Sequence, residues 1–148
     1  MSIFSQIMAG EIPANWVYQD ELCVAFMDIN PMSPGHVLVV PRLEVATLEE
    51  LPGDLRTHLL DVTVRVAAAQ RQGLGSLAQH VLVNDGKAAS QTVPHVHFHV
   101  IPRYGRDQIA TMSRIIWHVA TLMLPPSVSA SKRARLASQA EQIKQAMS

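Results

Sequence analysis

The 148-residue sequence contains a single cysteine, no excess of either charge and no long apolar run. One cysteine excludes an internal disulfide, and the chain shows no secretory leader, so we expect a cytosolic protein. Twelve Lys and Arg balance twelve Asp and Glu, which removes the positive excess that attracts proteins to nucleic-acid phosphates or anionic membranes. The most apolar stretch, 115–124, contains His118 and is shorter than the about 18 residues that span a bilayer. We therefore expect no nucleic-acid or membrane partner.

Charged residues are also scarce, at 16% of the chain against about 25% in typical proteins. Apolar residues account for 48%, which indicates a compact folded protein that has apolar surface available for a partner. The length fits one domain of about 150 residues. The only candidate hinge is the proline-containing and serine-containing stretch at 125–131, so the simplest organisation is one core with a C-terminal appendage.

Hydrophobic periodicity predicts both helices and strands. The most regular helical pattern follows Asp54, where Leu55, Leu59, Val62 and Val66 recur at intervals of three and four residues. The predicted helices cover 3–9, 54–73, 109–124 and a C-terminal segment that begins after Ser129 or Ser131. The predicted strands cover 16–19, 23–27, 36–40, 80–83 and 95–101. Because most strands are linked without an intervening helix, the fold class is α+β with an antiparallel sheet.

Histidine is the unusual feature, because three of the seven histidines fall within five residues. In the strand predicted at 95–101, a period of two places His95, His97 and His99 on one face and apolar side chains on the other. In a helix, His97 would instead lie about 200° from His95. Neighbouring imidazoles resist simultaneous protonation, so at least one should stay neutral and nucleophilic near pH 7.

Two other interpretations of this cluster are open. Buried histidines can be purely structural, although three on one strand face would be a costly way to fill a core. A His-x-His pair can also supply two ligands of a tetrahedral zinc site. Neither Cys23 nor a nearby acidic residue is evident as a third ligand, so a nucleophilic imidazole is favoured over a metal site.

The run from His95 to Ile101 resembles the defining motif of the histidine-triad (HIT) family of nucleotide-binding proteins. Five further segments resemble the family in the same order, which makes the match more specific than one short motif. They are 3–4, 11–14, 25–31, 34–42 and 91–94. The resemblance implies one HIT-like domain over 1–148, with a core at about 3–104 and a C-terminal helical extension at 105–148. The expected architecture is a five-stranded antiparallel sheet with one long helix and a C-terminal helix.

The resemblance also implies a mechanism. His97 would attack the α-phosphorus of a nucleotide and form a covalent nucleotidyl-histidine, which water then hydrolyses. Dividing one displacement into two steps lowers each barrier. His99 would contact the phosphate oxygens, His95 would support the site by hydrogen bonding, and His36 would complete the cluster.

Further positions match the family's nucleotide pocket. Asp28 would accept hydrogen bonds from the ribose hydroxyls. Without the resemblance, its position before Asn30 and Pro31 would be interpreted as that of a turn residue. The apolar walls around the base would be Phe4, Ile7, Phe26 and Ile29, each of which fits a core role equally well. The polar positions near the phosphate and leaving group would be Asn84, Ser90, Gln91 and Thr92.

The residue at the third triad position distinguishes hydrolysis from nucleotidyl transfer within the related proteins. Related nucleotidyl transferases carry Gln there, whereas this chain has His99, which favours hydrolysis to a nucleoside monophosphate. The resemblance implies a purine nucleotide substrate, either a phosphoramidate or a dinucleoside polyphosphate. The alternative is a nucleotide-binding module that regulates a partner and retains slow chemistry. The family's homodimers, in which two sheets join, imply a homodimer here.

Two departures from the family pattern affect these expectations. Many bacterial relatives hold zinc with a Cys-x-x-Cys motif and a histidine, where this chain has Ser2, Ser5 and Glu44. Serine hydroxyls do not replace thiolates, so structural zinc is not expected and no cofactor is predicted, with magnesium dependence left open. Ser90 stands where glycine is common, which leaves the backbone of the phosphate loop to be determined.

Overall fold

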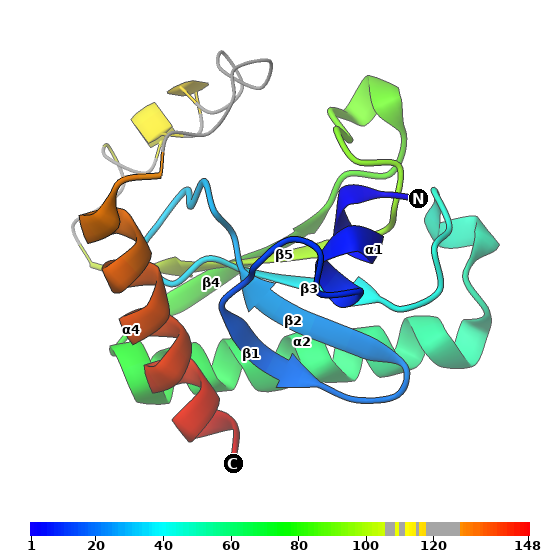
Figure 1. The fold of residues 1–148 in the computed structure, drawn as a ribbon. Helices are drawn as coiled ribbons and strands as arrows, with labels where there is room; N and C mark the ends of the chain where they lie inside the picture. The colour runs from blue at the N-terminus through cyan, green and yellow to red at the C-terminus, as the bar shows by residue number, and fades with distance from the viewer. Residues whose placement is uncertain (106–108, 110–111, 115, 118–127) are drawn as a thin grey trace.

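The centre of the molecule is a five-stranded antiparallel sheet in the order β1-β2-β3-β5-β4 (Figure 1). The computed structural model describes residues 1–105, 109, 112–114, 116–117 and 128–148. The strands are β1 (Trp16–Gln19), β2 (Cys23–Met27), β3 (Val37–Pro41), β4 (Ala78–Val83) and β5 (Phe98–Arg103). The α+β prediction with an antiparallel five-stranded sheet is therefore confirmed.

Among the described residues, three helices flank this sheet: α1 (Ile3–Met8), α2 (Gly53–Leu74) and α4 (Ala130–Met147). Short 3₁₀ turns, η1 (Leu48–Glu50) and η2 (Lys87–Ala89), lie in the loops. The prediction that α2 ends at Gly73 is wrong by one residue, because the left-handed cap that terminates the helix is Gly75, with φ 71°. Gly73 instead allows close packing, since a Cβ there would lie 2.5 Å from the backbone oxygen of Gln142 in α4.

The two faces of the sheet are covered differently. On one face, alternate residues of β2 and β3 pack against the apolar sides of α2 and α4, and the side chains of Leu59, Val66 and Ile143 in this core are fully buried. On the other face, the remaining alternate residues meet α1 in a smaller apolar cluster around Phe4 and Phe26. Figure 1 shows α1 and α2 on opposite sides of the strands. The period of two in the strands thus produces two separate layers.

The strand predicted at 95–101 begins later than expected, at Phe98. Pro94 has no backbone N–H, and the next two N–H groups donate outside the sheet, from His95 to the Val93 carbonyl and from Val96 to the Val45 carbonyl. The ladder with β3 includes the pairs Leu38↔His99 and Val39↔Phe98. The alternation survives this correction, because Val96 and Val100 enter the main core while the three histidines are buried outside it.

The C-terminal helix agrees with its predicted apolar face, since Leu136, Ala140 and Ile143 are buried. Of its two candidate caps, Ser129 is the one used, and its hydroxyl accepts the Lys132 N–H at 3.2 Å. The helix predicted at 109–124 falls mostly outside the described residues. Within the described parts of the chain, no helix combines the length and the apolar character needed to cross a bilayer.

Candidate active site

The triad histidines, His36 and Asp28 lie along β3 on one face of the sheet, from His36 and Asp28 at the start of β3 to His95 beside Pro41 at its end. Asp28 follows the last residue of β2 and His36 precedes the first residue of β3, and the antiparallel pairing Met27↔Val37 brings these two ends together. The Asp28 N–H donates to the His36 carbonyl at 2.9 Å. β5 then places His99 beside Leu38 of β3. All five residues are buried, so the site is a buried polar cluster.

His36 and His99 are linked through their ring nitrogens. The Met32 N–H donates to His36 Nδ1 at 3.1 Å, so the proton of neutral His36 lies on Nε2. That Nε2 lies 3.0 Å from His99 Nδ1 and 3.5 Å from Asp28 Oδ2. The His36 N–H therefore donates to His99 Nδ1, and the proton of neutral His99 is assigned to Nε2. One backbone N–H thus fixes the tautomers of two imidazoles in sequence.

His97 has the opposite tautomer. Its Nδ1 lies 2.8 Å from the His95 carbonyl oxygen, which can only accept, so Nδ1 carries the proton and Nε2 carries the lone pair. The ring centre lies 4.9 Å from that of His99 and 5.0 Å from that of Phe4. Burial lowers the pKa of His97 and outweighs the opposing effects of the His95 carbonyl and Asp28. His97 is consequently a neutral imidazole at pH 7 with an unprotonated nitrogen.

His95 joins the N-terminal helix to the sheet. Its Nε2 donates to the Pro41 carbonyl at 2.8 Å, so its Nδ1 accepts from the Ser2 hydroxyl at 2.7 Å. Burial lowers the pKa of His95, in agreement with a neutral ring. With its backbone oxygen holding His97, His95 connects Ser2, β3 and His97 through three hydrogen bonds.

Asp28 and the apolar residues of the predicted pocket lie on the same side of the sheet as the histidines. Asp28 Oδ1 accepts the Asn30 N–H at 2.8 Å. The edge of Phe4 faces the Phe26 ring, with ring centres 5.8 Å apart. Ile29 is 44% exposed, whereas Phe4, Ile7 and Phe26 are buried together in the smaller apolar cluster. The structure brings Phe4 to His97 and gives Phe26 and Ile7 a packing role.

The loop from Asn84 to Thr92 is held by side-chain amides. Gln91 accepts the Gly86 N–H at 2.7 Å and donates to the Ala46 carbonyl at 2.8 Å, so its amide ties this loop to the segment after β3. Asn84 makes a longer contact of 3.4 Å with the Ser90 carbonyl. Thr92 is exposed and lines a cavity of about 390 Å³ together with Ser2 and Glu44. The loop thus borders an opening beside α1.

Ser90 adopts a left-handed conformation, with φ 65° and ψ 27°. It is the one non-glycine residue with positive φ in the described chain. Side chains are strained in this region, which explains why glycine suits the position. The backbone left undetermined by the sequence is therefore a left-handed turn that serine tolerates.

Comparison with known proteins agrees with this geometry. A family model described as the HIT domain matches residues 9–106, which is more than half of the chain. The chain belongs to the HIT family. This HIT protein is 38% identical over 105 residues to an adenylylsulfatase of Arabidopsis thaliana, covering 71% of this chain and 53% of that protein. It is 37% identical over 106 residues to an adenosine 5'-monophosphoramidase of Saccharomyces cerevisiae, covering 72% and 63%.

A solved HIT structure shows the same fold. The crystal structure of a zinc-bound histidine-triad family protein from Mycobacterium smegmatis superimposes with a TM-score of 0.78 at 29% identity. The match covers 98% of this chain and 91% of that one. The zinc in that protein raises the question of whether the N-terminal residues here suit the same ion.

The N-terminal residues of this HIT protein do not fit zinc. Glu44 accepts the Ser2 N–H with both carboxylate oxygens at 3.0 Å and also accepts the Ser5 hydroxyl. These two donors hold the pKa of the Glu44 carboxyl below its ordinary value. Both nitrogens of His95 are already hydrogen-bonded, and hydroxyls are poor zinc ligands. At this position, where the zinc motif of relatives has thiolate ligands, this protein has serine hydroxyls. Hydrogen bonds of Ser2 and Ser5 therefore connect α1 to Glu44 and His95.

Sequence reasoning identified these serines and Glu44 only as departures from the family's zinc motif and missed the role of Ser2 as the hydrogen-bond partner of His95. The position of Ser2 immediately before the predicted helix 3–9 is a capping signal, and the Ser2 hydroxyl does accept the Ser5 N–H at 3.1 Å. Its contact with His95, 93 residues later, has no local signal. Only the tertiary arrangement reveals it.

Proposed function

We propose that this HIT protein is a hydrolase that cleaves purine nucleoside phosphoramidates or dinucleoside polyphosphates at the α-phosphate and releases a nucleoside monophosphate. The supporting observation is the paired tautomers of His97 and His99. His97 Nε2 carries a lone pair because Nδ1 donates to the His95 carbonyl, while the His99 proton is assigned to Nε2. A nucleophile and a hydrogen-bond donor therefore come from adjacent rings.

The reaction has two displacements. In the first, His97 Nε2 forms a bond to the α-phosphorus while the bond from phosphorus to the leaving group breaks, and the leaving group keeps the electron pair and takes up a proton. In the second, water attacks phosphorus, releases a proton and breaks the phosphorus–nitrogen bond, which restores neutral His97. The His99 N–H stabilises negative charge on the phosphate oxygens in both steps.

The remaining site residues have supporting roles. His36 fixes the tautomer of His99, and His95 orients His97 through its carbonyl. Asp28 contacts the ribose, and the base lies near Phe4, Phe26 and Ile29. The loop residues Asn84, Ser90, Gln91 and Thr92 border the phosphate and leaving group. These roles follow the family resemblance, and the buried hydrogen bonds described above are compatible with them.

The names of two relatives support an adenylyl substrate. An adenylylsulfatase and an adenosine 5'-monophosphoramidase both act on adenosine nucleotides that carry a leaving group on the phosphate. Because imidazoles supply both the nucleophile and the charge stabilisation, the proposed reaction requires no cofactor. Hydrolysis should therefore continue in the presence of EDTA, and a loss of turnover that added magnesium restores would contradict this part of the proposal.

The decisive experiment measures AMP release from adenosine phosphoramidate and from diadenosine polyphosphates. We expect turnover by the wild-type protein, and a loss of about 10⁴-fold or more in His97→Ala, since removal of a catalytic nucleophile has effects of this size. AMP binding should persist in that variant. His80→Ala is the matched control, because His80 is exposed on β4, and it should retain full activity.

The same measurements of AMP release and AMP binding distinguish the proposed hydrolase from the alternative function. A nucleotide-binding regulatory module would bind AMP tightly and release no product from either substrate class. Equal turnover by wild type and His97→Ala would contradict the nucleophile assignment even if the protein hydrolyses nucleotides.

We also propose a homodimer in which the long helix and its neighbouring edge strand form the interface. Leu60 and Val64 on α2 are 50% and 60% exposed, and Val81 on edge strand β4 is 47% exposed. Apolar side chains in such positions favour association. Light scattering should give twice the chain mass for wild type and the monomer mass for Leu60→Glu with Val64→Glu. A monomeric wild-type protein would contradict the proposal.

A further inference from the structure

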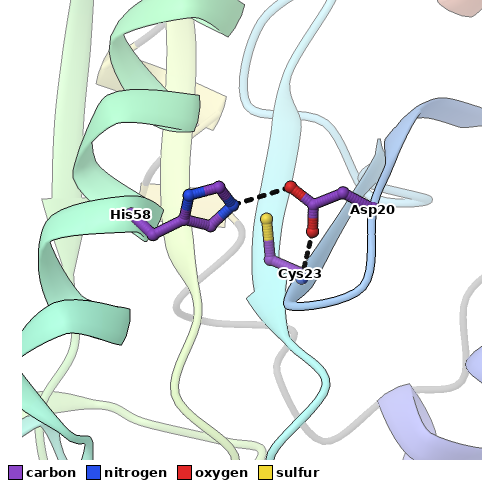
Figure 2. A group of neighbouring side chains, drawn as sticks. All are labelled: Asp20, Cys23 and His58. Carbon is purple, nitrogen blue, oxygen red and sulfur yellow. Dashed lines mark hydrogen bonds and ion pairs between the residues drawn. The ribbon is translucent and has the colours of Figure 1, made fainter.

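A second group of reactive side chains lies on the opposite face of the sheet from His97. Asp20 is in the turn between β1 and β2, Cys23 is the first residue of β2, and His58 is on α2. Cys23 belongs to the main core between the sheet and α2. Figure 2 shows the three side chains converging, with the His58 ring directed at the Asp20 carboxylate and the Cys23 sulfur beside them.

The ligand atoms of these residues are close together. The imidazole nitrogen, thiol sulfur and carboxylate oxygen all lie within 4.8 Å of one another. His58 Nε2 is 2.6 Å from Asp20 Oδ2. One nitrogen, one sulfur and one oxygen are thus held together by residues up to 38 positions apart.

The Asp20 carboxylate is oriented independently of His58. Its Oδ1 accepts the N–H groups of Leu22 at 2.8 Å and Cys23 at 2.7 Å, and its Oδ2 accepts the Tyr18 hydroxyl at 2.8 Å. Hydrogen bonds of this kind orient ligating carboxylates in metal sites. Asp20 would therefore keep its position if the His58 ring turned to share an ion with it.

Two of the three residues of this group are partly exposed to solvent. Cys23 is fully buried, whereas the side chains of His58 and Asp20 are 32% and 23% exposed. In the site proposed below, an ion would enter past the partly exposed His58 and Asp20, and water would supply the outer ligand. Three protein ligands and one water complete a tetrahedral site.

We propose that Asp20, Cys23 and His58 form a binding site for a zinc-type divalent cation. Zinc accepts carboxylate, thiolate and imidazole ligands together, and calcium or magnesium would not select a thiolate. The carboxylate and the thiolate supply two negative charges, which balance the ion. A bound ion would connect the β1–β2 turn to α2.

Binding exchanges protons and involves no redox change. Burial raises the pKa of the Cys23 thiol to about 12, so the metal-free protein holds a protonated thiol. Formation of the metal–sulfur bond releases that proton to solvent. In neutral His58 the proton moves from Nε2 to Nδ1, and the nitrogen–metal bond replaces the hydrogen bond to Asp20.

Cobalt titration of the full chain tests this site. Cys23 is the only cysteine, so a thiolate-to-cobalt charge-transfer band in the near ultraviolet reports this site and no other. We expect the band to saturate at one equivalent of Co²⁺ and to disappear when Zn²⁺ is added. Cys23→Ser should abolish it, and His58→Gln should weaken binding at least tenfold.

The control is His99→Asn, which disrupts the second cluster of possible ligands formed by Asp28, His36 and His99. That variant should keep the charge-transfer band. Thermal unfolding supplies a measurement that does not depend on the band: Zn²⁺ should raise the Tm of wild type and leave the Tm of Cys23→Ser unchanged. Absence of the band at excess Co²⁺, or a band unaffected by His58→Gln, would overturn the proposal.

Discussion

The two faces of the central sheet are both buried, and they differ in the side chains that they bury. The face beneath α2 and α4 is filled by aliphatic side chains such as Val39 and Leu59, whereas the face beneath α1 contains four buried histidines and Asp28. Buried polar groups are costly unless they are hydrogen-bonded. In the second layer the bonds to Ser2, Met32 and Pro41 meet this requirement, and they also select each tautomer. The comparison shows that the network that satisfies the polar groups of this layer also sets which nitrogen of each ring carries a proton.

The late start of β5 contributes to this arrangement. Among the described residues, no backbone N–H donates to the His95 carbonyl, which instead accepts His97 Nδ1. In a regular strand that carbonyl would be available to the sheet ladder. The segment before β5 therefore allows one histidine to fix the tautomer of the next.

The largest expected effect is on the apolar face. Leu59→Ala should lower the free energy of unfolding by about 2–5 kcal/mol, because it removes a fully buried side chain from the main core. Urea unfolding measures the loss. Leu22→Ala makes the same change at a 49% exposed position and should cost less than about 0.5 kcal/mol. A large drop in turnover per folded Leu59→Ala molecule would show that the two faces are not independent.

The polar face should be disrupted by removing the partner of His95. Ser2→Ala removes a helix cap and leaves His95 Nδ1 buried without its donor, so we expect a loss of about 1–3 kcal/mol in unfolding free energy. Ser129→Ala removes the cap of α4 alone and should cost about 0.5–2 kcal/mol. Chemical denaturation compares the two variants. A Ser2→Ala loss no larger than that of Ser129→Ala would show that the hydrogen bond to His95 contributes nothing.

The pH dependence of hydrolysis should reveal the buried nucleophile. Because burial lowers the pKa of His97 below 6.5, this histidine stays neutral and nucleophilic as the pH falls past that value. The acid limb of kcat/KM should therefore lie below pH 6.5. The pKa of His95 and of His97 is lower in the folded protein than in the unfolded chain. Below pH 6.5 the unfolded chain therefore binds more protons at these two residues than the folded protein does, so the free energy of unfolding should fall as the pH is lowered. An acid limb above pH 6.5 would contradict a desolvated nucleophile.

The smallest expected effect is at the loop beside the polar face. Ser90→Gly should raise the free energy of unfolding by up to about 1 kcal/mol, since glycine adopts φ 65° without strain. Ala89→Gly, one residue earlier at ordinary φ, should lower it slightly. Thermal unfolding of both variants tests the pair. Destabilisation by Ser90→Gly would show that the serine side chain itself supports the loop.

Local patterns in the sequence predicted most of the fold. The apolar periods of three and four located α2 and α4, and short runs rich in apolar and β-branched residues located the strands, with clear alternation only at 95–101. The start of β5 was predicted wrongly because alternation continues through His95, while the His95 N–H donates to the Val93 carbonyl and the Val96 N–H to the Val45 carbonyl in a distant loop. Periodicity describes side-chain direction and carries no information about which backbone groups pair.

Some residues of the candidate sites were predicted from the sequence and others were missed. The triad is a contiguous motif, so its residues were found directly, and His36 was added by the family resemblance. Cys23 was considered only as a further ligand for the His95 and His97 pair and was set aside. Its neighbours Asp20, three residues earlier, and His58, on α2, form no sequence motif with it, so their group was missed. The division of the chain at residue 104, the cytosolic location and the roles of the site residues stay predictions.

By itself, the sequence of this HIT protein determined the strand and helix periods, the alternation that separates histidines from valines, and the identity of the nucleophile candidate. The tertiary structure decided the protonation of each ring. A tautomer depends on what its nitrogens meet, and those partners, Ser2, Met32, Pro41 and the His95 carbonyl, are assembled by strand pairing and by the docking of α1. Chain-distant hydrogen bonds leave no local pattern, so only the folded protein shows which nitrogen of His97 carries the lone pair.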